Sequence, residues 1–142
     1  MTNTYTAKAS TVINAPASRV WEAITNPSLI KQYLFGTDVI SDWRVGSEIV
    51  YKGEWQGKPF EDKGRILQMD PGKTLATTHW SPLSGVPDTP ENYHRVVYTL
   101  NEEDGRTEVT ITQDNNASEE EKEHSEENWR QVLKGLKMLL EE

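Results

Sequence analysis

Hydrophobic residues recur along the chain with two different spacings. Apolar and polar residues alternate through residues 5–13, which predicts a strand with one buried face. Helical spacing follows, with Val20, Trp21 and Ile24 on one face of a short helix that begins near Pro16. The chain therefore opens with a strand and then a helix.

The middle of the chain predicts a second short helix and then a series of strands. PSLIKQYL at residues 27–34 has helical spacing, whereas the segments after it alternate and are separated by Gly, Pro and Asp turns. The predicted strands are TDVISDW, SEIVYKGEW, FEDKGRILQM, TLATTHW, YHRVVYTL and TEVTITQ. Short links predict antiparallel hairpins, except at residues 81–92, a Pro- and Ser-rich segment that we interpret as a flexible flap.

The last part of the chain predicts one long amphipathic helix. Ser118 and Glu121 have the spacing of a capping box, so the acidic run at residues 118–127 is interpreted as the solvated start of this helix. Its apolar stripe consists of Trp129, Val132, Leu133, Leu136, Leu139 and Leu140. A stripe of this length has to pack against another element.

The order of these elements predicts an α+β fold. A strand, two short helices, about six further strands and a long helix give an antiparallel sheet of about six to seven strands with the helices segregated from it. The C-terminal stripe can be buried only on the concave face of that sheet. We therefore expect residues 1–142 to form a single domain whose curved sheet wraps around the C-terminal helix.

The segment INAPASRVWEAITNPSLIKQYL resembles the opening of the heat-shock protein 90 ATPase activator homologue family, which belongs to the START-like (SRPBCC) superfamily. Further matches are Val45-Gly46, Gly64, Ile66, Met69, Asp70-Pro71, Leu75, Trp80, residues 95–98, Leu100, Gly105, Thr107 and the closing NWRQVLKGLKMLLEE. The order and spacing of these matches carry the resemblance over essentially the whole chain. In two places the chain departs from the family pattern: Tyr33 replaces a common Trp, and QDNNAS replaces a more apolar segment.

The resemblance implies the helix-grip fold, also called birch-pollen-allergen-like. It further implies a deep cavity between sheet and helix that holds an apolar small molecule in many relatives. Lipid carriers, hormone receptors, polyketide cyclases and stress-related co-chaperone domains share this superfamily. Function must therefore be inferred from the site itself.

Composition narrows the classes of function. Cysteine is absent, so thiolate chemistry and disulfides are excluded, and the net charge of −8 disfavours binding to nucleic acid or to an anionic membrane surface. We find no apolar run of about 18 residues, no signal peptide pattern, no paired-His metal motif and no cofactor-binding fingerprint. We therefore expect a cytoplasmic protein without cofactor or metal.

Alternation along the strands gives a candidate set of cavity residues. Tyr51 and Trp55 share the apolar face of their strand, and Tyr98 lies on the inward face of a later one. Trp80 and His79 point to opposite faces, and we expect Trp80 to be the inward one. The predicted cavity residues are Trp43, Tyr51, Trp55, Phe60, Trp80, Tyr98, Trp129, Leu133 and Leu136.

Polar anchors for a ligand are less well defined by the sequence. His79, His94, Arg95 and Gln113 are candidates, and Glu54 and Asp62 are further candidates for an anchor deep in the cavity. His94 and Arg95 are neighbours on one strand and face opposite ways, so only one of them can reach the cavity. No spacing of these residues matches a catalytic motif, so we assign no catalytic residue. A His close to a carboxylate across two strands still leaves acid–base chemistry open.

Three functions fit this sequence. The preferred hypothesis is a noncatalytic carrier or sensor that binds a small hydrophobic or aromatic molecule. The second is a co-chaperone-like protein interaction, although eukaryotic activators carry an N-terminal domain that this sequence lacks. The third is a cyclase- or dehydratase-type enzyme that uses a cavity His or Tyr. The sequence leaves ligand identity, pathway and oligomeric state open.

Overall fold

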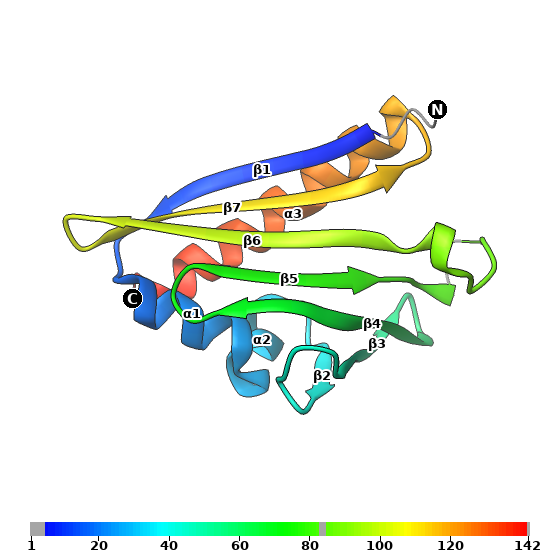
Figure 1. The fold of residues 1–142 in the computed structure, drawn as a ribbon, viewed down its shortest axis with the longest axis horizontal. Coiled ribbons are helices and arrows are strands. Elements are labelled where there is room, and N and C mark those ends of the chain that lie inside the picture. The colour runs from blue at the N-terminus through cyan, green and yellow to red at the C-terminus, as the bar shows by residue number, and fades with distance from the viewer. Residues whose placement is uncertain (1–4, 83–84, 142) are drawn as a thin grey trace.

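The computed structural model describes residues 5–82 and 85–141, which form one antiparallel sheet with helices on one side of it (Figure 1). The sheet has seven strands in the order β1-β7-β6-β5-β4-β3-β2. The α+β helix-grip prediction is thereby confirmed. In chain order the elements are β1 (Tyr5–Ile13), α1 (Ala17–Thr25), α2 (Pro27–Tyr33), β2 (Asp38–Ser41), β3 (Glu48–Trp55), β4 (Lys58–Asp70), β5 (Thr74–His79), the short 3-10 helix η2 (Pro90–Asn92), β6 (His94–Glu103), β7 (Arg106–Asn116) and α3 (Glu119–Leu140).

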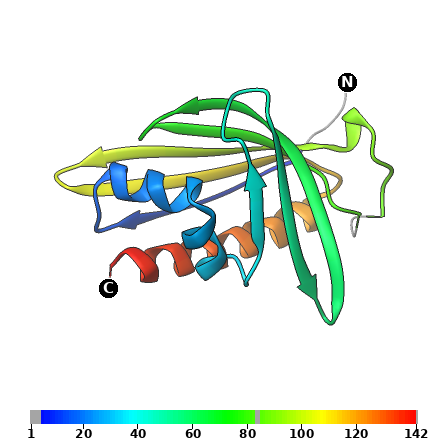
Figure 2. The same cartoon turned by 90° about the horizontal axis from the view of Figure 1, so that it is seen from below.

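The long helix α3 runs along the concave side of the sheet (Figure 2). It packs mainly on β1 and to a smaller extent on β7, while α1 and α2 lie beside its C-terminal part. Its main contacts are therefore at one edge of the sheet, and β3, β4 and β5 belong to the other part. Inward-facing residues of that other part are nevertheless buried, among them Ile49 of β3, Ile66 of β4 and Leu75 of β5.

Local sequence signals explain where the helices begin. The Asn26 side chain accepts a hydrogen bond from the backbone N–H of Ser28 at the start of α2. At α3 the Glu121 N–H donates to the Ser118 hydroxyl at 3.1 Å, and the Glu121 side chain accepts from the N–H of Ala117. The predicted cap at Ser118 is confirmed.

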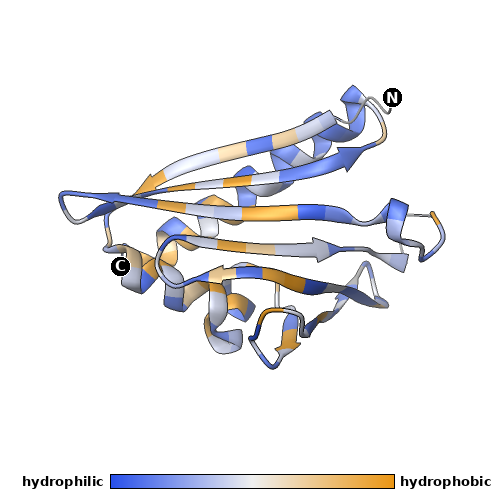
Figure 3. Cartoon of the chain, viewed as in Figure 1, coloured by the Kyte–Doolittle hydropathy of each residue, from blue (hydrophilic) through white to orange (hydrophobic). Residues whose placement is uncertain are grey.

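Alternation along the strands produces the core. Bands of hydrophobic and hydrophilic residues follow one another along the ribbon (Figure 3). The largest fully buried side chains include Ile13, Val20, Val109, Ile111, Leu133 and Leu136. Val109 and Ile111 face the helices from β7, and Leu133 and Leu136 meet the sheet from α3. Apolar burial of this kind is the main favourable contribution to folding.

Several strands differ from their predicted extent, β2 and β7 among them. β2 ends at Ser41, so Trp43 lies beyond it with a backbone φ of 55°. β7 continues to Asn116, so most of the polar segment QDNNAS belongs to a strand rather than to a loop. The reason is a side-chain network, described below, that uses these polar residues.

The sheet bends where β4 passes β5. The pairing shifts register between Ile66 and Gln68, which is a β-bulge. Two residues before that shift, a Cβ placed on Gly64 would lie 1.7 Å from the carbonyl oxygen of Thr78. Only glycine allows the two backbones to approach so closely.

Candidate functional site

The helix-facing side of the sheet has two chemically different parts. One part is aliphatic and closed, formed where α1, α2 and the second half of α3 cover the sheet. The other part is aromatic and polar, near the end of β5 and the start of β6. We call this second part the inner site; it consists of Tyr51, Phe60, Asp62, His79, Tyr98 and Trp129.

Register places the inner-site strand residues on one face. Tyr51 of β3 pairs with Asp62 of β4, and Tyr98 of β6 pairs with the buried Leu75 and Ile111. His79 follows Leu75 at even spacing on β5, so it faces the same side. These residues come from four neighbouring strands and converge because the sheet is curved.

Contacts between rings link the site to α3. The Tyr98 and Trp129 rings meet edge to face with centroids 6.0 Å apart. The Trp129 indole N–H donates to Gln113 Oε1 at 2.8 Å, which fixes the orientation of the indole. On the other side, the Tyr51 ring meets the His79 ring at 5.7 Å.

Three tyrosines lie in or beside this region, of which Tyr33 is buried and Tyr51 and Tyr98 are half-buried. Burial raises the pKa of Tyr33, Tyr51 and Tyr98, and the negative charge of a Tyr51 phenolate would raise the pKa of Tyr33 and Tyr98 further. At Tyr51, the nearby Asp62 carboxylate also raises the pKa, whereas the Thr77 hydroxyl lowers it. All three phenols are neutral at physiological pH, and Tyr33 donates its hydroxyl proton to the Ala23 carbonyl at 2.9 Å.

Asp62 and His79 form a polar pair at the end of the site. His79 Nε2 lies 3.0 Å from Asp62 Oδ2, and the two side chains are 31% and 15% exposed. Asp62 Oδ1 is buried, and no other residue in the described part of the chain gives it a hydrogen bond. A His that is oriented by a carboxylate can accept or donate a proton, and a carboxylate oxygen can accept a hydrogen bond from a ligand.

Phe60 is the remaining residue of the inner site, and its ring has room there because the residue opposite it on β3 is a glycine. Phe60 pairs with Gly53 across the β3–β4 hairpin, and a Cβ on Gly53 would lie 2.8 Å from the Phe60 ring. The missing side chain gives the ring space to lie over β3. The Thr37 hydroxyl is also close to this position.

The predicted inward orientation of Trp80 is wrong. Trp80 lies on the outer face, where its ring stacks on Tyr93 with centroids 6.4 Å apart and Lys63 Nζ lies 5.8 Å from the centroid of its ring. The alternation of β5 continues unbroken from Leu75 to His79, so His79 takes the inward position. The bulge that shifts the register lies in β4, not in β5.

Other residues that the sequence predicts for the cavity lie outside the inner site. Leu133 and Leu136 are fully buried in the aliphatic core, and Trp43 packs against that core from beyond β2. Arg95 is exposed on the outer face, whereas its neighbour His94 faces inward, because β6 alternates about the buried Val96. The Trp55 side chain lies outside the described residues.

His94 and Gln113 face inward but already have partners. His94 Nδ1 is 2.8 Å from the Asp114 carbonyl oxygen, and Gln113 Oε1 holds the Trp129 indole. Thr77 and Tyr33 were not among the candidates, although the alternation from Leu75 would have placed Thr77 on the inward face. Asp62, one of the candidate anchors, has a buried carboxylate oxygen without a hydrogen-bond partner among the described residues.

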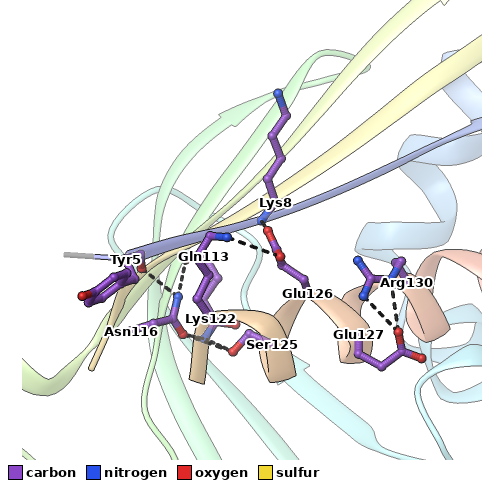
Figure 4. A network of polar contacts seen from close by, with 9 residues as sticks. All are labelled: Tyr5, Lys8, Gln113, Asn116, Lys122, Ser125, Glu126, Glu127 and Arg130. Atoms are coloured by element: carbon purple, nitrogen blue, oxygen red, sulfur yellow. Dashed lines mark hydrogen bonds and ion pairs between the residues drawn. The ribbon is translucent and has the colours of Figure 1, made fainter. Parts of the chain in front are cut away.

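Buried Asn116 joins β7 to α3 and to β1 (Figure 4). Its amide N–H groups donate to the carbonyls of Tyr5 and Gln113, both at 2.9 Å. Its Oδ1 accepts from the Ser125 hydroxyl at 3.1 Å and from Gln113 Nε2 at 3.2 Å. The polar segment at the end of β7 therefore fixes the first half of α3 to the sheet.

We expect Asn116→Ala to lower the free energy of unfolding by about 1–3 kcal/mol, because Ala leaves buried donors and acceptors without partners. Asn101→Ala is the matched control, since Asn101 is exposed on β6. Urea denaturation of both variants measures the difference. Equal small losses in both would show that the network adds nothing to stability.

The described part of the flap is fixed to the outer face. Asp88 lies 2.5 Å from Lys63 Nζ and accepts a hydrogen bond from the Tyr93 hydroxyl at 2.6 Å. These bonds lower the pKa of the Asp88 carboxyl. A surface hollow of about 400 Å³ lies beside these residues. Residues 83–84, at the tip of the predicted flap, lie outside the described residues.

Among residues 5–82 and 85–141, no group of three or more His, Asp or Glu side chains is arranged to hold a metal ion. No helix in the same part of the chain is long and apolar enough to cross a membrane.

Comparison with known proteins adds to this geometry. Residues 14–141 match the family described as activator of Hsp90 ATPase homolog 1-like protein. The solution structure of ChR145 from Cytophaga hutchinsonii is similar to this chain, with 55% identity, a TM-score of 0.87 and coverage of 99% of this chain and 97% of that chain. A comparison with curated proteins found no match.

More distant solved structures share the fold. MLL2253 from Mesorhizobium loti is 23% identical with a TM-score of 0.78, covering 96% of this chain and 97% of that one. The Aha1 dimer from Colwellia psychrerythraea is 21% identical with a TM-score of 0.74, covering 96% of each chain. At these identities the likeness concerns the fold alone.

Proposed function

The chain belongs to the activator of Hsp90 ATPase homolog 1-like family, and from that premise we propose that it binds a small aromatic or hydrophobic molecule at the inner site, as a carrier or sensor. The ligand would lie between the curved sheet and α3. Its flat apolar body would contact the rings of Tyr51, Phe60 and Tyr98.

One observation carries this proposal: aromatic side chains on the helix-facing side of the sheet keep accessible surface. Tyr51, Tyr98 and Trp129 are only half-buried, whereas Val109 and Ile111 on the same face of the sheet are fully buried. Rigid rings with free surface and a few polar groups beside them are typical of small-molecule sites.

The acidic start of α3 supports the ligand-binding proposal over a docking surface for a chaperone. Several of its carboxylates already have partners within the chain. Glu121 caps the helix, Glu126 accepts a hydrogen bond from the Lys8 N–H at 3.0 Å, and Glu127 pairs with Arg130 at 3.0 Å. Contacts within the chain thus explain the presence of several carboxylates in this acidic run, as expected for a solvated helix start.

A pair of phenylalanine variants tests the proposal. We expect the wild-type protein to bind 2-naphthol, measured by isothermal titration calorimetry. Phe60→Ala should weaken this binding about tenfold, because the ligand loses an aromatic contact of roughly 1.4 kcal/mol. Phe35→Ala is the matched control, since Phe35 is 79% exposed and outside the inner site.

The outcome is decisive in both directions. Unchanged affinity in Phe35→Ala with weaker affinity in Phe60→Ala supports binding at the inner site. No heat of binding for the wild-type protein at the solubility limit of 2-naphthol, or equal losses in both variants, would contradict the proposal. Thermal unfolding of both variants verifies that they are folded.

A further inference from the structure

Asp62 has one carboxylate oxygen that the fold does not use. Oδ2 faces His79 at 3.0 Å, but Oδ1 is buried without a hydrogen-bond partner among the described residues. Buried polar atoms in folded proteins are nearly always paired, and leaving a charged one unpaired is costly. An orphaned oxygen on this face therefore suggests a partner outside the chain.

The surroundings of Asp62 define what that partner can be. Asp62 pairs in register with Tyr51 and lies two residues along β4 from Phe60, so rings adjoin it on the inner side. An ionised carboxylate accepts hydrogen bonds and donates none. A ligand that reaches Oδ1 must therefore bring a hydroxyl or N–H group next to an apolar body.

We propose that Asp62 Oδ1 makes the inner site selective for aromatic molecules that carry a neutral or cationic hydrogen-bond donor, such as phenols, aryl alcohols and aryl amines. This inference rests on the proposed function, since it names the ligand class for the same site. Ligands whose only polar group is an ether or a carboxylate would be disfavoured. An ether offers no donor, and a second carboxylate would place like charges together in a poorly hydrated region.

The geometry separates donor recognition from simple burial of apolar surface. Burial alone favours the more apolar of two similar ligands, because each added methyl group removes more apolar surface from water. A site with a buried acceptor does the opposite, since a ligand without a donor leaves that acceptor unpaired. The order of affinities within a matched pair of ligands therefore distinguishes the two cases.

The test compares 2-naphthol with 2-methoxynaphthalene, which has the same rings but no donor. Dissociation constants are measured by equilibrium dialysis on the full chain. We expect the wild-type protein to bind 2-naphthol at least tenfold more tightly, and Asp62→Ala to bind the two within about twofold of each other. Glu61→Ala should keep the wild-type preference, because Glu61 is on the opposite face of β4, 60% exposed beside Lys52.

The outcomes distinguish a failure of selection by Asp62 from a failure of ligand binding itself. If wild type binds both compounds equally well, or if Asp62→Ala keeps the preference, selection by Asp62 is refuted while ligand binding stands. If neither compound binds to the wild-type protein, the proposed function fails and this inference fails with it. Should Asp62→Ala not fold, the preference measured on wild type and on the isosteric Asp62→Asn, which we expect to weaken it, still decides the matter.

Discussion

Gly64→Ala should destabilise the protein by about 4 kcal/mol and lower its midpoint of thermal unfolding by on the order of 10 °C. The reason is steric. The new Cβ would lie 1.7 Å from the carbonyl oxygen and 2.5 Å from the carbonyl carbon of Thr78. Both are backbone atoms of a paired strand, so relief requires β4 and β5 to move apart.

Gly72→Ala provides the control for this prediction. Gly72 has a φ of +76°, and a Cβ there would meet nothing within 4 Å. Its replacement should cost only about 1 kcal/mol, from the strained backbone conformation. If calorimetry gave equal losses for the two variants, the close approach at Gly64 would not be the feature that holds the bend.

The bend at Gly64 also matters for the inner site. Asp62 and His79 come from β4 and β5 on either side of this close approach. Forcing the strands apart would increase the separation of their side chains, now 3.0 Å. We therefore expect any folded Gly64→Ala protein to bind 2-naphthol more weakly as well.

Leu136→Ala should lower the free energy of unfolding by about 3 kcal/mol, because it leaves a cavity in the aliphatic core. Leu136 is 0% exposed, whereas Met138 on the same helix is 63% exposed. Met138→Ala should therefore change stability by less than about 0.5 kcal/mol in the same denaturation experiment. A loss below about 1 kcal/mol at Leu136 would mean that this side chain borders open space.

Much of the fold follows from local patterns in the sequence. Alternation over residues 5–13 and the apolar stripe of α3 depend on neighbouring residues only, and both are where the sequence predicts them. The cap at Ser118 is local in the same sense. The order of the strands in the sheet is harder to predict than the strands themselves. Short turns between consecutive strands favour antiparallel hairpins.

The orientation of Trp80 could not be derived from hydrophobicity. A large indole was expected inside, yet Trp80 is covered on the outer face by Tyr93 and Lys63, which come from other segments of the chain. Strict alternation from Leu75 would have placed His79 inward. Where hydrophobicity and strand parity disagree on a short strand, parity is the better guide in this protein.

The polar residues of the inner site depend on contacts between distant segments. Asp62 and His79 are 17 residues apart in the sequence, and they face each other only because β4 and β5 are paired. Gln113, expected as a ligand anchor, instead holds the indole of Trp129. The register between strands decides which of these side chains meet, and a single sequence does not contain it. The sequence therefore predicts which residue types lie in the site better than it predicts the partner of each residue.

Two indole N–H signals test the central proposal most directly. Trp129 belongs to the inner site and Trp80 lies on the outer face, so a ¹H–¹⁵N NMR titration with 2-naphthol reports on both sides of the sheet at once. We expect a saturable shift of the Trp129 indole signal and no change at Trp80. No saturable change at Trp129, or a shift at Trp80 alone, would contradict ligand binding between the sheet and α3.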